Sequence, residues 1–137
     1  MNILVIDAQG GGMGRQLVTK IRERIPDAEV IAVGSNSMAT GAMIKAGASR
    51  AATGENAVKV CAEMADIITG PIGILVANAM LGEITPSMAE AVGKSKAQRV
   101  LVPVANCSTS IAGVKSQNVG QMIDDAVTII EKYANLI

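Results

Sequence analysis

Short, continuous apolar runs alternate with stretches of helical periodicity along the whole of this 137-residue chain. The clearest apolar runs occupy residues 3–6 and 30–33, and a third one, residues 100–104, follows Arg99. Strands without polar alternation are typical of parallel sheets that helices cover on both faces. The pattern therefore predicts an α/β fold: one doubly wound, Rossmann-like domain over residues 1–137, with five or six mostly parallel strands and helices on both faces of the sheet.

The strands of this sheet are expected at six places. The ranges are 3–6, 30–33, 50–52, 66–69, 99–104 and, as a marginal sixth strand, 110–114. Connections between parallel strands are right-handed, which restricts the possible topologies to a few. We expect the strand order 3-2-1-4-5-6, with 2-1-3-4-5 as the alternative.

Capping residues mark the expected helix boundaries. Residues 35–37 supply N-caps for a second helix, and Thr85 followed by Pro86 suits the start of a later one. Asn118 and Gln121 are spaced like a capping box before the last amphipathic helix. Four residues of the second helix are expected on its buried face: Met38, Ala42, Met43 and Ala46.

Residues 71–81 are ambiguous between helix and irregular structure. They are rich in Ala, Met and Leu, and Pro71 suits the first turn of a helix. We expect them to form a buried helix.

Composition excludes several kinds of function. The chain has 12 basic and 12 acidic residues, so its net charge gives no general attraction to nucleic acid or to a membrane surface. It has no His, which excludes a histidine-based triad and a histidine-ligated metal site within one chain. With one Tyr and neither Phe nor Trp, it cannot offer aromatic platforms for stacked bases. No nucleic-acid partner, membrane or metal is therefore expected.

The two cysteines, Cys61 and Cys107, are too few for a disulfide scaffold and lack metal-ligand spacing. The N-terminus has no signal-peptide pattern. The longest apolar stretch, residues 67–82, is interrupted and shorter than the roughly 20 residues that span a bilayer. We therefore expect a cytoplasmic protein with reduced thiols.

The strongest functional pattern is a glycine-rich segment between the first strand and the first helix, Asp7-Ala8-Gln9-Gly10-Gly11-Gly12-Met13-Gly14-Arg15. Glycines let a ligand approach the backbone, and the helix N-terminus presents unpaired N–H groups to an anion. The pattern G-x-G-x-x-G is incomplete, because Gln9 stands at the first position when Gly11 and Gly14 take the other two. A Walker loop is not met either, since Arg15 and Gln16 replace its lysine and hydroxyl residue. The segment predicts an anion, nucleotide or dinucleotide site, and the alternative is a tight turn without a ligand.

Polar residues after other strands are candidates for the same site. Ligands of open α/β sheets lie outside the carboxyl ends of the strands, where Ser35, Asn36, Thr69 and Gly70 are expected. The Asp or Glu that binds the ribose of NAD at the end of the second strand is absent. Ser35 and Asn36 would instead hold a phosphate or ribose, or they would only cap the second helix.

Three residues near this edge are weak candidates for catalysis. Asp7 and Glu55 are carboxylates of the kind that act as general acid or base. For Asp7 we favour a role as acceptor for loop amides, and Glu55 also suits the first turn of a helix. Cys107 would need Lys, Arg or a helix N-terminus to activate it, because the chain has no His.

Four further segments, together with the glycine-rich segment, are specific as a set. They are Gly-Ser-Asn-Ser at 34–37, Thr-Gly-Glu-Asn at 53–56, Gly-Pro-Ile-Gly at 70–73 and Asn-Ala-Met-Leu-Gly-Glu-Ile-Thr-Pro at 78–86. With them the chain resembles, from Asn2 to the last helix, the small bacterial family named domain of unknown function 3842. The resemblance implies a compact Rossmann-like domain and implies no catalytic role.

Three functions are open at this point, because a fold of this kind hosts many. The first is binding of a nucleotide or other phosphorylated small molecule at residues 10–14. Gly12→Ala and Gly14→Ala would then abolish binding and spare most of the fold. The second is a nicotinamide-dependent or transferase-type enzyme in the same crevice. The third is a structural or regulatory subunit that docks a protein partner through its apolar helices.

The apolar character of residues 71–92 adds an expectation about assembly. This stretch holds more apolar surface than a small sheet needs, which is typical of a subunit interface. We expect a homo-oligomer, a dimer or larger.

Overall fold

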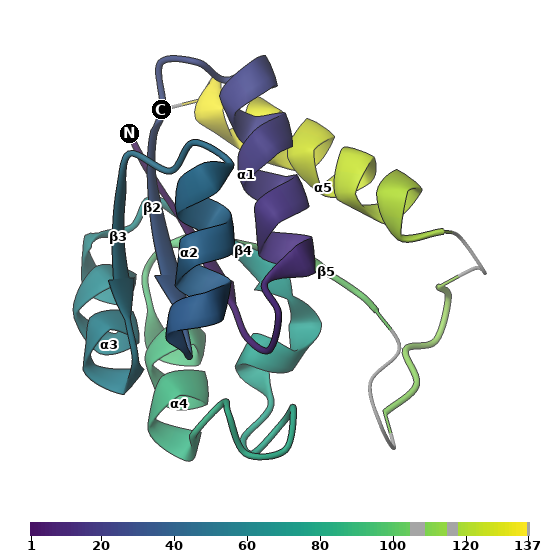
Figure 1. Ribbon diagram of the computed structural model, residues 1–137. Coiled ribbons are helices and arrows are strands. Elements are labelled where there is room, and N and C mark those ends of the chain that lie inside the picture. The colour runs from purple at the N-terminus through teal and green to yellow at the C-terminus, as the bar shows by residue number, and fades with distance from the viewer. Residues whose placement is uncertain (105–108, 115–117, 137) are drawn as a thin grey trace.

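The computed structural model describes residues 1–104, 109–114 and 118–136, and within them five strands form one parallel sheet (Figure 1). The strands are β1 (Asn2–Asp7), β2 (Glu29–Gly34), β3 (Arg50–Thr53), β4 (Ile67–Pro71) and β5 (Gln98–Val102). Their order is β3-β2-β1-β4-β5, and every neighbouring pair is parallel. The first of the two predicted orders is thus confirmed for these five strands.

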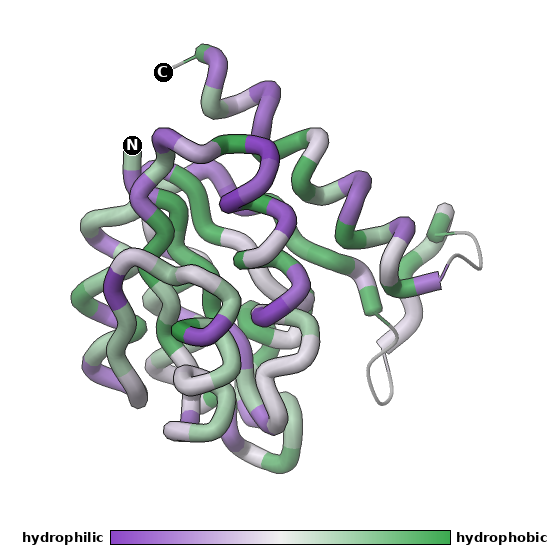
Figure 2. Tube along the Cα trace, turned by 45° about the horizontal axis from the view of Figure 1, so that its top comes forward, coloured by the Kyte–Doolittle hydropathy of each residue, from purple (hydrophilic) through white to green (hydrophobic). Residues whose placement is uncertain are grey.

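Helices cover both faces of the sheet, as the apolar runs predicted (Figure 1). One face carries α1 (Gly12–Arg24), α2 (Ser37–Lys45) and α5 (Val119–Ala134), and the other carries α3 (Glu55–Met64) and α4 (Pro86–Lys94). Successive residues of β1 enter opposite cores: Ile3 lies in the first and Leu4 in the second. Hydrophobic segments accordingly gather along the central strands, with hydrophilic stretches on the outer helix faces (Figure 2).

The predicted caps are present. The Asn36 side-chain oxygen accepts from the Ala39 N–H at 2.9 Å, and Thr85 Oγ1 accepts from the Met88 N–H at 3.2 Å. Asn118 likewise caps α5 by accepting from the Gln121 N–H at 2.8 Å. These local side-chain bonds satisfy helix N–H groups that have no partner inside the helix.

The predicted buried face of α2 is wrong at Met38, whose side chain is 70% exposed. The helix buries Ala39, Thr40 and Met43 instead. Thr40 takes an inward position because its hydroxyl finds partners there, including Thr53 Oγ1 at 2.7 Å. A buried hydroxyl that is hydrogen-bonded carries little penalty, so apolarity alone did not decide which side faces the core.

The predicted helix over residues 71–81 is also wrong. Pro71 ends β4, a single 3₁₀ turn follows at η1 (Ile72–Leu75), and turns continue to α4. Asn78, Met80 and Leu81 have φ values of 65°, 56° and 59°, in the left-handed region. Such residues cannot continue a right-handed helix.

The marginal sixth strand at 110–114 is absent from the described structure, where these residues are exposed and unpaired with the sheet. Gly113, at φ 86°, makes a turn there. No helix within the described ranges is both long and apolar enough to cross a membrane.

The direction in which the strands are added to the sheet reverses once, between β3 and β4. The chain passes from β1 through α1 to β2 and β3, and then crosses back through α3 to β4, which lies on the other side of β1. In open α/β sheets this reversal leaves a crevice at the carboxyl ends of the two central strands. The glycine-rich segment follows β1 and therefore lies at that crevice.

Candidate functional site

The glycine-rich segment combines closely packed glycines with open ones. An added Cβ at Gly11, which has φ +74°, would lie 2.7 Å from Ala39 Cα in α2. At Gly14 it would lie 2.6 Å from Met43 Sδ and 2.8 Å from Asp7 Cβ. An added Cβ at Gly10 or Gly12 would meet nothing within 4 Å. Gly11 and Gly14 thus bring α1 close to its neighbours, while Gly10 and Gly12 leave the backbone open.

This geometry explains the incomplete glycine pattern. Gln9 has φ 52° and makes the tight turn that the first glycine makes in the G-x-G-x-x-G pattern. Polar residues visit this left-handed region at modest cost. Gly14 takes the third position, whose role is close packing of the helix. The structure changes the expectation for Gly14→Ala: the added methyl would crowd Met43 and Asp7 beneath α1, so we expect this variant to lose stability.

Asp7 lies beneath the loop as an acceptor for its amides, as we favoured. Its side chain is 5% exposed, and its two oxygens accept from the Ala8 N–H at 2.8 Å and the Gly14 N–H at 2.6 Å. Burial raises the pKa of Asp7, while the two amide bonds oppose the rise. The carboxylate thus ties the end of β1 to the first turn of α1.

Three other amides of the segment have no hydrogen-bond partner in the described part of the chain. The N–H groups of Gly10, Gly12 and Met13 donate to no group among residues 1–104, 109–114 and 118–136. The same three residues line a pocket of about 220 Å³, which also touches Pro71 at the end of β4 and Met80. The pocket therefore lies at the crevice between β1 and β4, and the residues that carry these three N–H groups line it.

A carboxylate that sequence reasoning did not single out lies beside this pocket. Glu83, in the loop before α4, accepts three hydrogen bonds on Oε1: from the Gln9 N–H at 2.9 Å, Ser35 Oγ at 2.6 Å and Asn36 Nδ2 at 2.8 Å. These bonds, the one from Ser35 first, hold the pKa of Glu83 below its ordinary value. The only sequence signal was its membership of the 78–86 segment.

Ser35 and Asn36 therefore reach the predicted site, but their side chains already have partners. Asn36 donates to the Gln9 carbonyl at 2.9 Å as well as to Glu83, and its oxygen caps α2. The predicted direct contact of these two side chains with a phosphate would require them to release Glu83. Their observed role is to hold the loop before α4 against the glycine-rich segment.

Other predicted site residues lie at or near the same edge. Thr69 is fully buried, and its Oγ1 has no hydrogen-bond partner in the described part of the chain. Gly70 is held against β1, where an added Cβ would collide with the Ile6 carbonyl oxygen. Arg15 is exposed on α1, in the turn that follows the loop.

The structure describes two of the three catalytic candidates, Asp7 and Glu55, and does not bring them together. Glu55 is exposed at the start of α3 and accepts from Thr85 Oγ1 at 2.6 Å, away from the residues that line the pocket. Cys107 lies outside the described residues. Asp7 is the one titratable residue among those that the structure places on the pocket wall. In the described ranges, no group of three or more His, Cys, Asp or Glu is placed to hold a metal ion.

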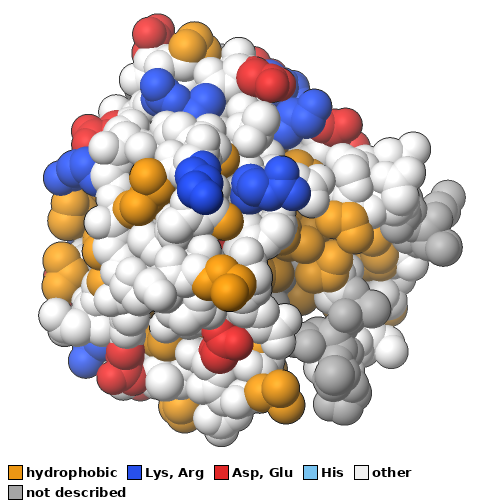
Figure 3. Space-filling view, in the orientation of Figure 1, with side chains coloured by type: hydrophobic (Ala, Val, Ile, Leu, Met, Phe, Trp, Pro, Cys, Tyr) orange, Lys and Arg blue, Asp and Glu red, His pale blue; other side chains and the backbone are white. Residues whose placement is uncertain are grey.

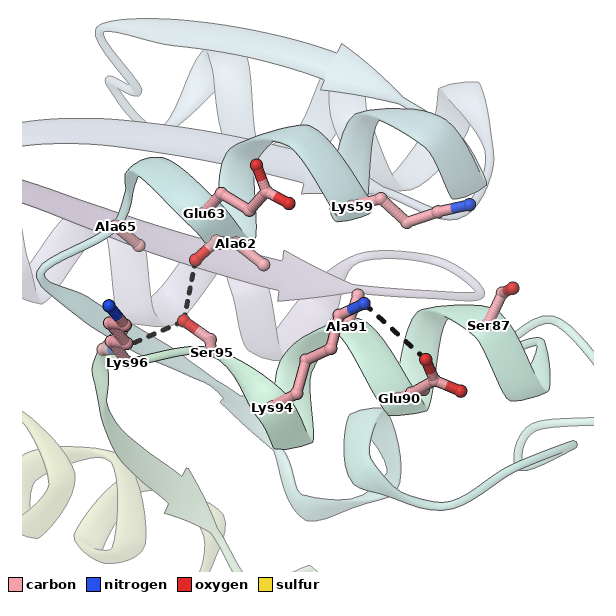
Figure 4. Close-up of a pocket in the computed structure, with 11 residues that line it drawn as sticks. Lys59, Ala62, Glu63, Ala65, Ser87, Glu90, Ala91, Lys94, Ser95 and Lys96 are labelled. Carbon is pink, nitrogen blue, oxygen red and sulfur yellow. Dashed lines mark hydrogen bonds and ion pairs between the residues drawn. The ribbon is translucent and has the colours of Figure 1, made fainter.

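Two larger surface hollows lie elsewhere. One, of about 480 Å³, runs between α3 and α4, where Lys59 and Glu63 face Glu90 and Lys94 (Figure 4). Its wall includes residues 95–97, which precede β5, so it extends to the amino edge of the sheet. Another, of about 250 Å³, lies between β5 and α5 beside a cluster of apolar side chains (Figure 3). Neither is at the strand reversal, where ligands of such sheets bind.

Comparison with known proteins bears on the family. A search of curated proteins found no match. Among solved structures, the chain is similar to a dodecameric FMN-dependent UbiX-like decarboxylase from Escherichia coli O157:H7. The sequence identity is 16% and the TM-score 0.45, over 96% of this chain and 76% of that one.

The family comparison confirms the resemblance found in the sequence. The family described as "Domain of unknown function (DUF3842)" matches residues 2–135, which include every strand and helix of the described structure. The chain therefore belongs to the family of the domain of unknown function DUF3842.

Proposed function

We propose that this protein binds a nucleotide or a related phosphorylated small molecule at the glycine-rich segment. The observation that carries the proposal is that Gly10, Gly12 and Met13, whose N–H groups have no acceptor among the described residues, line the pocket at the strand reversal. Backbone donors at the start of a helix favour an anion through both hydrogen bonds and the helix dipole. α1 has 13 residues, so it carries the macrodipole of a helix of ordinary length.

The size of the pocket indicates how a ligand would lie. Its volume of about 220 Å³ is below the roughly 300–1,000 Å³ typical of small-molecule sites. It suits a phosphate group and part of a sugar. The rest of a nucleotide would extend over the carboxyl ends of the strands, along the residues that follow β1 and β2.

The hydrogen bonds that the two candidate carboxylates already make favour binding over catalysis. Both oxygens of Asp7 are engaged by loop amides, so moving its proton would disturb the loop itself. Glu55 bonds to Thr85 outside the pocket. A nicotinamide-dependent or transferase-type enzyme remains the second candidate, supported by the raised pKa of Asp7 at the pocket wall. Turnover that disappears in a folded Asp7→Asn variant would favour the enzyme.

The test is a dye-based thermal-shift screen of AMP, ADP, NAD, FMN and inorganic pyrophosphate. A compound at about 100 times its dissociation constant should add about 2.7 kcal/mol, or roughly 8–10 °C for a chain of this length. Gly12→Ala should remove the shift, because its methyl would cover the open amides. Gly41→Ala is the matched control, since its added methyl also meets open space, in α2.

Two outcomes would contradict the proposed site. A shift that persists in Gly12→Ala would place the ligand elsewhere. No shift with any phosphate-bearing compound at millimolar concentration would refute the proposal and favour the third function, docking of a protein partner.

We also propose the homo-oligomer that the sequence predicts. Leu81 is 99% exposed at the tip of the loop before α4, and Val76 at its base is 37% exposed. Large apolar side chains left in water by a loop of fixed geometry favour a subunit contact. Sedimentation velocity should give a dimer or larger, and Leu81→Ser should shift the distribution toward monomer. A wild-type monomer at 100 µM would contradict this.

A further inference from the structure

Glu83 lies near the end of β2, where dinucleotide-binding domains carry an acidic residue and this chain has none. Doubly wound dinucleotide domains place an Asp or Glu at the carboxyl end of β2, and that carboxylate accepts a hydrogen bond from the ribose 2′-hydroxyl. In this chain β2 ends at Gly34, and the residues that follow it are Ser35 and Asn36. Both donate to Glu83 Oε1. The loop before α4 thus brings to the end of β2 the charge that β2 itself does not carry.

The carboxylate is held by one oxygen only. All three of its hydrogen bonds end on Oε1, and Oε2 accepts none from the described residues. A carboxylate can accept about two hydrogen bonds on each oxygen, so Oε2 keeps its full capacity for a ligand hydroxyl. The bonds to Oε1 fix the side chain in advance, which lowers the entropy that binding would cost.

The loop that carries Glu83 is itself well anchored. Ile84, the next residue, is fully buried, and its carbonyl accepts from the Asn78 N–H at 2.7 Å. The left-handed residues Asn78, Met80 and Leu81 fold this loop back on itself. The position of Glu83 is therefore set by a folded loop and a buried neighbour, in addition to its three donors.

Glu83 is also next to the unpaired amides. Gln9 donates its N–H to Glu83 and lines the pocket together with Gly10 and Gly12. A phosphate on the amides and a sugar hydroxyl on Oε2 would thus be neighbouring parts of one ligand. This is the arrangement of a nucleoside 5′-phosphate or diphosphate, whose ribose follows directly on its phosphates.

We propose that Glu83 is the ribose-binding residue of this site and that it selects ligands with a free 2′-hydroxyl. The inference rests on the proposed function, because it needs a phosphate on the amides. The carboxylate is ionised at neutral pH, so it accepts a hydroxyl and repels a 2′-phosphate. In the described structure no Lys or Arg forms an ion pair with Glu83 to offset that repulsion.

The experiment is isothermal titration of ADP, 2′-deoxy-ADP, ADP with a 2′-phosphate, and inorganic pyrophosphate. Wild-type protein should bind ADP about tenfold more tightly than 2′-deoxy-ADP, as expected for one hydrogen bond to a charged group. The 2′-phosphate should weaken binding more strongly still. Glu83→Gln should reduce both preferences to about threefold or less, and any gain in phosphate affinity from the loss of the neighbouring charge should be shared by ADP and 2′-deoxy-ADP alike. Glu90→Gln, at an exposed residue of α4 in the hollow that faces α3, is the matched control and should behave as wild type.

The outcomes separate the two proposals. If pyrophosphate binds and wild type does not distinguish ADP from 2′-deoxy-ADP, the role of Glu83 is overturned and the phosphate site stands. If Glu83→Gln keeps the wild-type preference for ADP over 2′-deoxy-ADP, another group binds the 2′-hydroxyl, and the inference is wrong. If neither pyrophosphate nor ADP binds, both proposals fail. The wild-type comparison needs no variant, so a misfolded Glu83→Gln would not prevent the test.

Discussion

Gly14→Ala tests the claim that this glycine packs α1 against the sheet and does not serve the ligand directly. The added Cβ would lie 2.6 Å from Met43 Sδ, 2.8 Å from Asp7 Cβ and 3.0 Å from Asp7 Oδ2. The methionine end can move aside, but Asp7 lies at the end of β1, and its carboxylate is bonded to the Gly14 N–H itself. Relief of the contact therefore pulls α1 away from Asp7.

The size of the effect follows from three contributions. Overpacking of a core costs about 1–3 kcal/mol. Weakening the bond from the Gly14 N–H to the carboxylate adds up to about 1.5–3 kcal/mol, the typical value for a bond to a charged group. The better helix propensity of alanine returns at most about 1 kcal/mol. We expect a net loss of about 2–3 kcal/mol, or roughly 6–12 °C in melting temperature.

Equilibrium urea unfolding followed by far-ultraviolet circular dichroism measures this loss, since the chain has no Trp to report. Gly12→Ala is the control, because its methyl meets open space and should change stability by less than about 1 kcal/mol. A Gly14→Ala protein as stable as Gly12→Ala, with an unchanged urea slope, would refute the packing role.

Three other residues allow independent tests. Glu83→Gln should weaken the pH dependence of the free energy of unfolding below about pH 4.5. The pKa of folded Glu83 lies below its ordinary 4.5, so the wild-type protein loses stability as the pH falls from about 4.5. The same pH dependence in both proteins, measured by urea unfolding, would contradict this. Ile84→Ala should cost about 2–5 kcal/mol in the same assay, because Ile84 is fully buried, and a loss below about 1 kcal/mol would show that the loop is not anchored there. Burial raises the pKa of the Cys61 thiol, so iodoacetamide should modify Cys61 more slowly in folded than in urea-unfolded protein. Peptide mass spectrometry measures both rates, and equal rates would contradict this prediction.

Local patterns were enough to predict most of the architecture. The run at residues 3–6 predicted a central parallel strand, and β1 is buried on both faces. Thr85 and Asn118 predicted helix starts correctly because a cap bonds to an amide only three residues away. Asp7 was correctly interpreted as an acceptor for loop amides for a similar reason, since Ala8 and Gly14 are close in sequence.

The errors arose where distant parts of the chain decide the outcome. Residues 71–81 have a helix-forming composition, but η1 and Ile84 pack into the second core and the chain between them turns back through left-handed residues. Met38 is exposed because the Thr40 hydroxyl finds two partners on β3, the Ala52 carbonyl and Thr53 Oγ1. Tertiary contacts of this kind override local propensity, which amounts to only tenths of a kcal/mol per residue.

The sequence by itself determined the parallel sheet and the glycine-rich turn after β1, because apolar periodicity, caps and glycines act over a few residues. It left two strand orders open, and the tertiary structure decided between them. Only the tertiary structure decided which glycines are open and which are packed, since that depends on Ala39, Met43 and Asp7 around them. It alone placed Glu83 at the end of β2, 74 residues from Gln9 along the chain. Hydrogen bonds across such separations leave no periodic trace in a sequence, because only the folded backbone brings the donors and the acceptor within 3 Å.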